Sequence, residues 1–124
     1  MKKIILLFSH KLTDSQIKDI KRKLQCKEIL YLPEKIQSIF SNVTSDNREF
    51  VINELKVYLS KNADKGDYIL IQGEFGVSYK MINYSKEIGL IPVYSSTKRE
   101  TIEINKGNKI KKITFFKHEE FVEY

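Results

Sequence analysis

Four short and mainly apolar segments divide the chain, at residues 4–8, 28–32, 67–72 and 90–94. The segments between them are longer and carry most of the polar side chains. Continuous apolar runs of this length are typical of strands that are covered on both faces of a sheet. The pattern therefore predicts four buried strands joined by crossover connections.

The intervening segments have helical features. Thr13 followed by Gln16 is the pattern of a capping box, and apolar side chains at Ile17, Ile20 and Leu24 share one face of the helix that would follow. Three more helices are expected, at about residues 34–40, from near Asp46 to near Lys61, and over residues 77–88. Gly89 is a typical glycine after a helix C-terminus.

The end of the chain changes to a strand pattern. Residues 101–104 alternate between polar and apolar, residues 106–108 favour a turn, and residues 110–116 return with four apolar side chains. This is the signature of a β-hairpin, which either extends the sheet edge or pairs with a second subunit. The order β-α-β-α-α-β-α-β plus a hairpin predicts one α/β domain over residues 1–124, a Rossmann-like sandwich with a mostly parallel sheet between helices.

Composition and charge add two points. With 124 residues, 41% hydrophobic and 31% charged, the chain is expected to be globular. The formal net charge is +6, and most of it falls in the hairpin at residues 98–118, where seven basic residues face two acids between Lys98 and Lys117. This favours an anionic partner without choosing among nucleic acid, nucleotide and acidic protein, although the lysines would also serve simply to solvate a hairpin.

Several classes of protein are disfavoured. No apolar run approaches the length of a membrane span, and the short run after Met1 lacks a cleavage site, so we expect a cytoplasmic protein without a membrane partner. Cys26 is the single cysteine and is expected to be a packed thiol. The two histidines, His10 and His118, form no cluster with ligand spacing, so we expect neither a metal nor another cofactor.

The first candidate functional residues lie in the segments directly after the third and fourth predicted strands. If these strands are parallel neighbours, the segments after them lie together at the sheet edge where open α/β sheets bind ligands. Gly73-Glu74-Phe75-Gly76 offers backbone N–H groups at a helix start, which suit an anion. The segment lacks the dinucleotide fingerprint and the Walker loop, and an ordinary strand-to-helix turn would also explain it. Phe75 is suited to stacking on a base or to packing in the core.

The segment Ser95-Ser96-Thr97-Lys98-Arg99 is expected to be a loop after the fourth strand. Its hydroxyls donate to phosphate oxygens, lysine supplies a compact charge and arginine grips two oxygens. A polar turn leading into a hairpin is the alternative.

Other candidates lie at the same predicted edge. Ser9, His10 and Lys11 follow the first strand, and a histidine there would transfer protons near neutral pH. Gln72 and Tyr79 are placed either to contact a ligand or to pack. His118 is expected to be structural. Glu74 is the one acid in the predicted site, which disfavours paired-carboxylate chemistry, and the lack of a G-x-S-x-G elbow disfavours Ser/His/Asp hydrolysis.

These residues also carry a family resemblance. The segments Leu6–Thr13, Tyr31–Pro33, Gly66–Gly76 and Gly89–Arg99 occur in an order and spacing that resembles the small stand-alone Csx-type proteins of type III CRISPR loci. The resemblance covers nearly the whole chain. It implies a fold similar to CARF domains, the Rossmann-like sensors of cyclic oligoadenylate.

The resemblance implies a ring nuclease that opens cyclic tetra-adenylate and ends the antiviral signal. It also implies a homodimer with the ring across the twofold axis, and metal-independent attack of a ribose 2′-OH that leaves a 2′,3′-cyclic phosphate. On this basis Lys98 and Arg99 would stabilise charge and His10 would move a proton. The expected ligand-binding residues are Ser9, Lys11, Gln72, Gly73, Glu74, Phe75, Gly76, Tyr79, Ser95, Ser96 and Thr97.

Two alternatives stay open at this point. The first is a protein of the same fold that binds cyclic oligoadenylate without cutting it, as a sponge or a sensor. The second is a basic module that binds single-stranded RNA through the hairpin, with a strong dependence on salt. DNA is not an expected partner.

Overall fold

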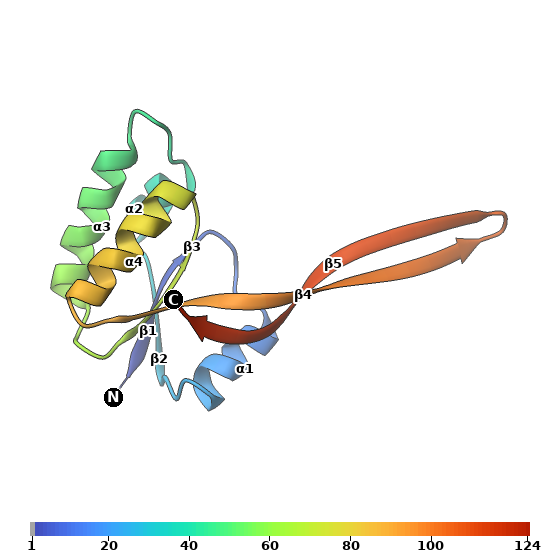
Figure 1. The fold of residues 1–124 in the computed structure, drawn as a ribbon, viewed down its shortest axis with the longest axis horizontal. Helices are drawn as coiled ribbons and strands as arrows, with labels where there is room; N and C mark the ends of the chain where they lie inside the picture. The colour runs from blue at the N-terminus through green and yellow to red at the C-terminus, as the bar shows by residue number, and fades with distance from the viewer. Residues whose placement is uncertain (1) are drawn as a thin grey trace.

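The computed structural model describes residues 2–124, which form five strands and four helices (Figure 1). In chain order these elements are β1 (Lys3–Phe8), α1 (Asp14–Arg22), β2 (Glu28–Tyr31), α2 (Glu34–Ser41), α3 (Arg48–Asn62), β3 (Tyr68–Gln72), α4 (Phe75–Glu87), β4 (Ile91–Lys106) and β5 (Lys109–Glu123).

The five strands form one sheet in the order β2-β1-β3-β4-β5. The first four run parallel, and β5 runs antiparallel to β4. The prediction of an α/β fold with a mostly parallel sheet is therefore confirmed. Because β3 and β4 are parallel neighbours, Gln72 at the end of β3 and Ser95, which follows the part of β4 paired with β3, are brought to the same edge, as the sequence predicted.

Side-chain alternation along the strands builds a core on each face of the sheet. On one face Ile4, Leu6 and Leu70 pack with Ile20 of α1. On the other face Ile5, Leu7, Ile69 and Ile71 pack under α2, α3 and α4. Figure 1 shows α1 separated from the other three helices by the strands. The helices thus cover both faces, which explains why the strand segments are almost wholly apolar.

The helix starts follow their local sequence. The Thr13 side chain accepts from the Gln16 N–H, and Gln16 Oε1 accepts from the Thr13 N–H, so the predicted capping box is present. Helix α4 begins at Phe75, two residues before its predicted start, because the Glu74 carboxylate caps it by accepting from the Val77 N–H. Phe75 and Gly76 are therefore helical, and Tyr79 lies in the second turn rather than the first.

Strand β4 corrects a prediction. Residues 95–99 were expected to form a loop between the fourth strand and a separate hairpin, but β4 continues from Ile91 to Lys106 without interruption. The reason is β5, which pairs with β4 from Val93 to Lys106, with one irregularity between Ser96 and Thr97. The fourth strand is itself the first strand of the hairpin.

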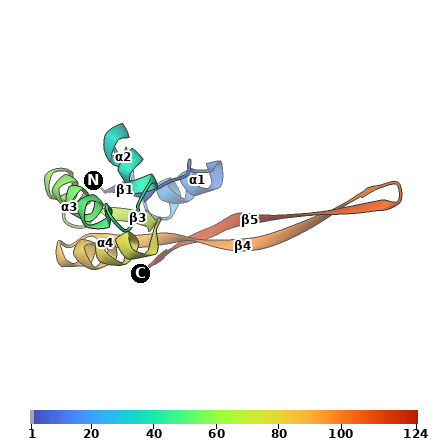
Figure 2. The ribbon, with the colours of Figure 1, turned by 90° about the horizontal axis from the view of Figure 1, so that it is seen from above.

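Beyond the helices the hairpin projects from the body as a long two-stranded ribbon, here called the arm and defined as residues 98–117 (Figures 1 and 2). All residues from Thr101 to Lys117 are exposed. The strands are joined by Gly107 and Asn108, and Gly107 has φ of 60°, as the first position of a type II′ turn requires.

The arm has two different faces, because successive side chains of a strand alternate. The cross-strand pair Ile102 and Ile113 lies on one face, together with Ile104, Phe115, Glu100 and Lys111. The other face carries Thr101, Thr114 and the ion pair between Lys112 and Glu103, with Nζ and Oε1 3.7 Å apart, together with the exposed Ile110 and Phe116. Four apolar side chains of the first face are thus left in solvent, with exposed fractions from 36% to 49%.

Three sequence expectations concern single features of the chain. Cys26 is buried, which raises the pKa of its thiol to about 11, so the prediction of a packed thiol is confirmed. Within residues 2–124 no helix is long and apolar enough to cross a membrane. The same residues contain no group of three His, Cys, Asp or Glu side chains arranged to hold a metal ion.

Candidate functional site

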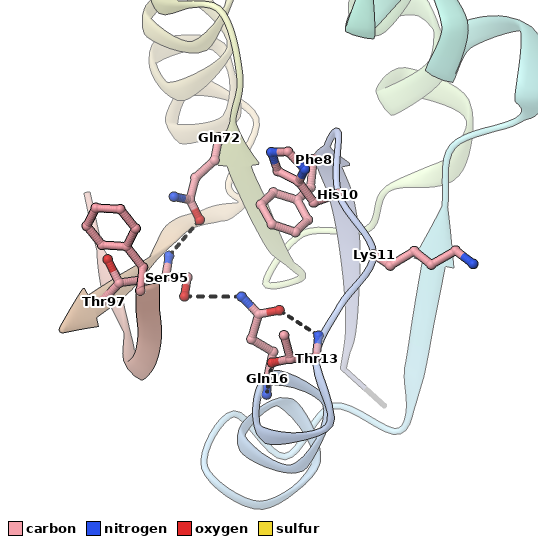
Figure 3. Close-up of a pocket in the computed structure, with 9 residues that line it drawn as sticks. Phe8, His10, Lys11, Thr13, Gln16, Gln72, Ser95 and Thr97 are labelled. Atoms are coloured by element: carbon pink, nitrogen blue, oxygen red, sulfur yellow. Dashed lines mark hydrogen bonds between the residues drawn. The ribbon is translucent and has the colours of Figure 1, made fainter. Parts of the chain in front are cut away.

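A pocket of about 500 Å³ opens at the carboxyl ends of β1 and β3, beside β4 and the start of α1 (Figure 3). It combines segments that the sequence predicted to meet at this edge. The residues that line it are Phe8, His10, Lys11, Thr13, Gln16, Gln72, Ser95, Thr97 and Phe116.

Two glutamines hold Ser95 at the wall of this pocket. Gln72 Oε1 accepts from the Ser95 N–H at 2.9 Å, and Gln16 Nε2 donates to Ser95 Oγ at 3.3 Å (Figure 3). Gln16 is itself fixed because its Oε1 accepts from the Thr13 N–H at 2.8 Å. Gln16, the second member of the capping box of α1, therefore also positions a hydroxyl of β4.

Behind Ser95 lies a hydrogen-bonded chain that sequence reasoning missed. Ser95 Oγ is 2.5 Å from His118 Nδ1, and His118 Nε2 is 2.8 Å from Asp19 Oδ2. The His118 side chain is 3% exposed, and its ring packs against that of Phe121. Ser95 lines the pocket, whereas His118 and Asp19 do not. We call these three residues the Ser95–His118–Asp19 chain.

The Ser95–His118–Asp19 chain revises two expectations. The burial of His118 fits the expected structural role, but both of its ring nitrogens are hydrogen-bonded, and Nδ1 reaches the hydroxyl of Ser95 in the pocket. A Ser/His/Asp arrangement was disfavoured because the sequence has no nucleophile elbow, yet β4, β5 and α1 bring one together without it. Asp19 and His118 are 99 positions apart in the sequence and form no local motif, so no spacing signal was available.

The segment after β1 supplies the open rim of the pocket. His10 is exposed, and its ring meets the edge of Phe8 with centroids 5.5 Å apart. Lys11 also lines the pocket, although its side chain extends away from Ser95 and Gln72 (Figure 3). Ser9 is not in the lining, and its hydroxyl lies 3.5 Å from that of Ser41.

The segment from Gly73 to Gly76 does not line this pocket. Glu74 Oε1 accepts from the Val77 N–H at 2.8 Å, and Glu74 Oε2 accepts from Arg48 Nη2 at 2.7 Å and from Nε at 2.9 Å. These bonds, those from Arg48 above all, hold the pKa of Glu74 below its usual range. The bare N–H groups expected here for a phosphate are therefore not all free, because the chain's own carboxylate occupies the helix start.

The glycines of this segment are explained by packing. A Cβ placed on Gly73 would lie 2.5 Å from Phe40 Cζ, and one on Gly76 would lie 2.9 Å from Arg48 Nε. The segment thus turns toward α2 and α3, on the sheet face opposite α1. The exposed aromatic rings beside it, Phe75 and Tyr79, are 92% and 66% exposed and lie outside the pocket lining.

The residues expected as the second loop are separated by strand alternation. Thr97 lines the pocket beside Ser95, and Arg99 continues on that face opposite Phe116, another lining residue. Ser96 and Lys98 belong to the other face, where Lys98 pairs with Lys117. The predicted cationic pair is therefore split between the two faces of the ribbon.

Comparison with known proteins identifies the family. The model of the "Uncharacterized protein MJ1673 family" matches residues 2–122. This chain belongs to that family. It is also 45% identical over 126 residues to the "Uncharacterized protein MJ1673" of Methanocaldococcus jannaschii, an alignment that covers 100% of this chain and 98% of the relative. No solved structure matches the chain.

Proposed function

We propose that this protein is a CARF-like ring nuclease that binds and cleaves cyclic oligoadenylate, with cyclic tetra-adenylate as the expected ring, as a homodimer. The observation that carries the proposal is the pocket at the carboxyl ends of β1 and β3, where His10, Gln72, Ser95 and Thr97 converge from separate segments. Ligands of open α/β sheets bind at this edge. Hydroxyl, amide and imidazole groups are suited to phosphate and ribose oxygens.

The proposed reaction needs no metal from the protein. A ribose 2′-OH attacks the adjacent phosphorus, the bond from phosphorus to the 5′-oxygen breaks, and the products end in a 2′,3′-cyclic phosphate and a 5′-OH. The pocket holds the hydroxyl in line with the leaving oxygen, and positive groups stabilise the added charge on the phosphoryl oxygens. His10, exposed at the rim, gives a proton to the leaving oxygen.

Arg99 is the cation that we assign to the phosphoryl group. It continues the pocket face of β4 beyond Thr97, and its planar guanidinium binds two phosphate oxygens at once. Lys98, the other cation predicted for this role, lies on the opposite face and is left with a general contribution to the positive potential.

The arm supports the proposed homodimer. An isolated two-stranded ribbon is marginally stable in water, and this one exposes the apolar side chains of Ile102, Ile104, Ile113 and Phe115 on one face. A second copy of the chain would cover that face.

The two alternatives make different predictions. A sponge binds the ring and releases it intact. An RNA-binding module would use the exposed lysines near the tip of the arm, Lys106, Lys109, Lys111 and Lys112. Its binding to linear RNA would fall steeply with salt and would not respond to changes in the pocket.

The deciding experiment is a time course of the purified protein with cyclic tetra-adenylate in EDTA, resolved by chromatography and mass spectrometry. Linear products with a terminal cyclic phosphate, lost in Arg99→Ala, are expected. An intact ring that co-elutes with the protein would instead identify a sponge. Neither binding nor cleavage, for this ring and for rings of other sizes, would contradict the proposal.

A further inference from the structure

We infer that Ser95 is a catalytic residue whose hydroxyl passes protons between the pocket and His118, with Asp19 holding the histidine in position. The inference rests on the proposed function where it names the substrate hydroxyl. The chemistry of the Ser95–His118–Asp19 chain itself can also be tested without that substrate.

For an ionised Asp19 and a neutral His118, the donor inventory of the three groups sets the direction of the hydrogen bonds. An ionised Asp19 only accepts, so the bond of 2.8 Å to its Oδ2 requires a proton on His118 Nε2. A neutral ring then has an unprotonated Nδ1, which accepts the Ser95 hydroxyl proton across 2.5 Å. Ser95 is thereby set up as a donor to a base that is oriented by a carboxylate, the arrangement that activates hydroxyls in nucleophilic sites.

The Ser95 oxygen lines the pocket and keeps one free lone pair, although the residue is only 5% exposed. A serine hydroxyl has one proton and two lone pairs, and one lone pair is used by Gln16 Nε2 at 3.3 Å. The other can accept a proton from a hydroxyl bound in the pocket. Because His118 and Asp19 are absent from the lining, the proton reaches them through Ser95.

In the proposed reaction the ribose 2′-OH gives its proton to Ser95 Oγ as the Ser95 proton moves to His118 Nδ1. The 2′-oxygen bonds to phosphorus and the 5′-oxygen leaves, protonated by His10. His118 then carries a positive charge beside the Asp19 carboxylate, which stabilises it. After the products depart, the proton on His118 returns to solvent through Ser95 and His10 takes up a proton from solvent, so both groups are restored.

The first experiment needs no nucleotide. The protein is treated with diisopropyl fluorophosphate. In the labelling reaction Ser95 Oγ bonds to phosphorus, fluoride leaves and the serine proton goes to His118. Mass spectrometry should find the label on Ser95, with a rate that falls about 10²- to 10⁴-fold in His118→Ala and is partly restored by added imidazole. Asp19→Asn, which keeps the packing, should also slow labelling, and the exposed Ser60→Ala should not change it.

The second experiment is single-turnover cleavage of cyclic tetra-adenylate by the wild type, Ser95→Ala, His118→Gln and Asp19→Asn, with ring affinity measured in parallel. Ser95→Ala and His118→Gln should lose about 10²-fold or more in rate while affinity changes little. If the wild type cleaves and both Ser95→Ala and His118→Gln cleave as fast as the wild type, the inference is overturned and the nuclease proposal stands. If the wild type does not cleave, the labelling experiment decides. Labelling of Ser95 that depends on His118 supports the role of the Ser95–His118–Asp19 chain but not the nuclease proposal, and an unlabelled Ser95 overturns that role.

Discussion

Arg48 holds Glu74 by two hydrogen bonds to the same oxygen, from Nη2 at 2.7 Å and from Nε at 2.9 Å. The first residue of α3 is thereby fastened to the residue that caps α4. The other Glu74 oxygen accepts the Val77 N–H, so one carboxylate joins two helices that are separate in sequence. The pair is partly exposed, with 36% and 31% of the two side chains accessible.

This contact predicts a pH dependence of stability. The pKa of Glu74 is lowered in the folded protein from an ordinary value of 4.5, chiefly by the hydrogen bonding from Arg48. Its contribution is therefore complete above that ordinary value and is lost as the pH falls through the lowered folded-state pKa. Glu74→Gln, which can still accept from Val77, should be less stable than the wild type at pH 7, and the gap should close on acidification.

Chemical denaturation at a series of pH values measures this gap. Glu87→Gln is the matched control, because Glu87 is exposed at the C-terminal end of the same helix, where a negative charge is not favoured by the helix dipole. A gap for Glu74→Gln that stays constant down to pH 3 would show that the charge of Glu74 does not stabilise the fold.

Gly73 makes a second prediction, about packing. Because a Cβ at this position would lie 2.5 Å from Phe40 Cζ, Gly73→Ala should destabilise the fold by about 1–3 kcal/mol, the usual cost of overpacking. In a Phe40→Leu background the same change should cost less, since the ring that it strikes is gone. Equilibrium unfolding of the two single variants and the double variant measures the coupling. Additive losses would contradict this account of Gly73.

Much of the fold could be predicted because it depends on local pattern. The apolar runs identified β1 and β3, and the Thr13–Gln16 pair identified the start of α1. The course of residues 95–99 could not be predicted, because their polar composition is typical of a loop. Their strand conformation depends on pairing with β5, and Ser95 itself pairs with Phe121 far along the chain.

The candidate site divides in the same way. His10, Gln72 and Ser95 meet at one pocket because parallel strands place their carboxyl ends together, which the order of elements implies. Local sequence does not determine which face of the sheet a following segment turns toward. Gly73 turned toward Phe40, and His118 reached Asp19 through pairing of β5 and packing of α1, both of which are tertiary effects.

The arm gives a third prediction, about assembly. Glutamate at Ile102 would place a charge on the apolar face that we propose a second copy covers, so Ile102→Glu should shift the protein from a dimer toward a monomer of 14.6 kDa. Thr101→Glu is the matched control, because the side chain of Thr101 lies on the face opposite that of Ile102. Light scattering coupled to size exclusion measures both. A wild type that is already monomeric, or equal effects of the two variants, would argue against this interface.

The last prediction uses the placement of Arg99 and Lys98 on opposite faces of β4. It tests which of the two faces contacts the ligand. Both residues are exposed cations, adjacent in sequence, so truncating either removes the same formal charge. Only Arg99 shares a face with Thr97 and Phe116, which line the pocket. Hydrogen bonds to charged groups contribute about 1.5–3 kcal/mol, so Arg99→Ala should weaken binding of cyclic tetra-adenylate by roughly 10- to 100-fold.

Lys98→Ala should change that affinity by no more than about threefold, as expected of a charge that acts only through the general potential. Calorimetric titration at one fixed salt concentration compares the two variants, and Lys111→Ala near the tip of the arm reports the effect of a remote lysine. If Lys98→Ala weakens binding and Arg99→Ala does not, the ring lies on the face that carries Ser96, and the pocket beside Ser95 is not its site. Equal losses for all three variants would instead indicate non-specific attraction of an anion to the basic arm, the behaviour expected of the RNA-binding alternative.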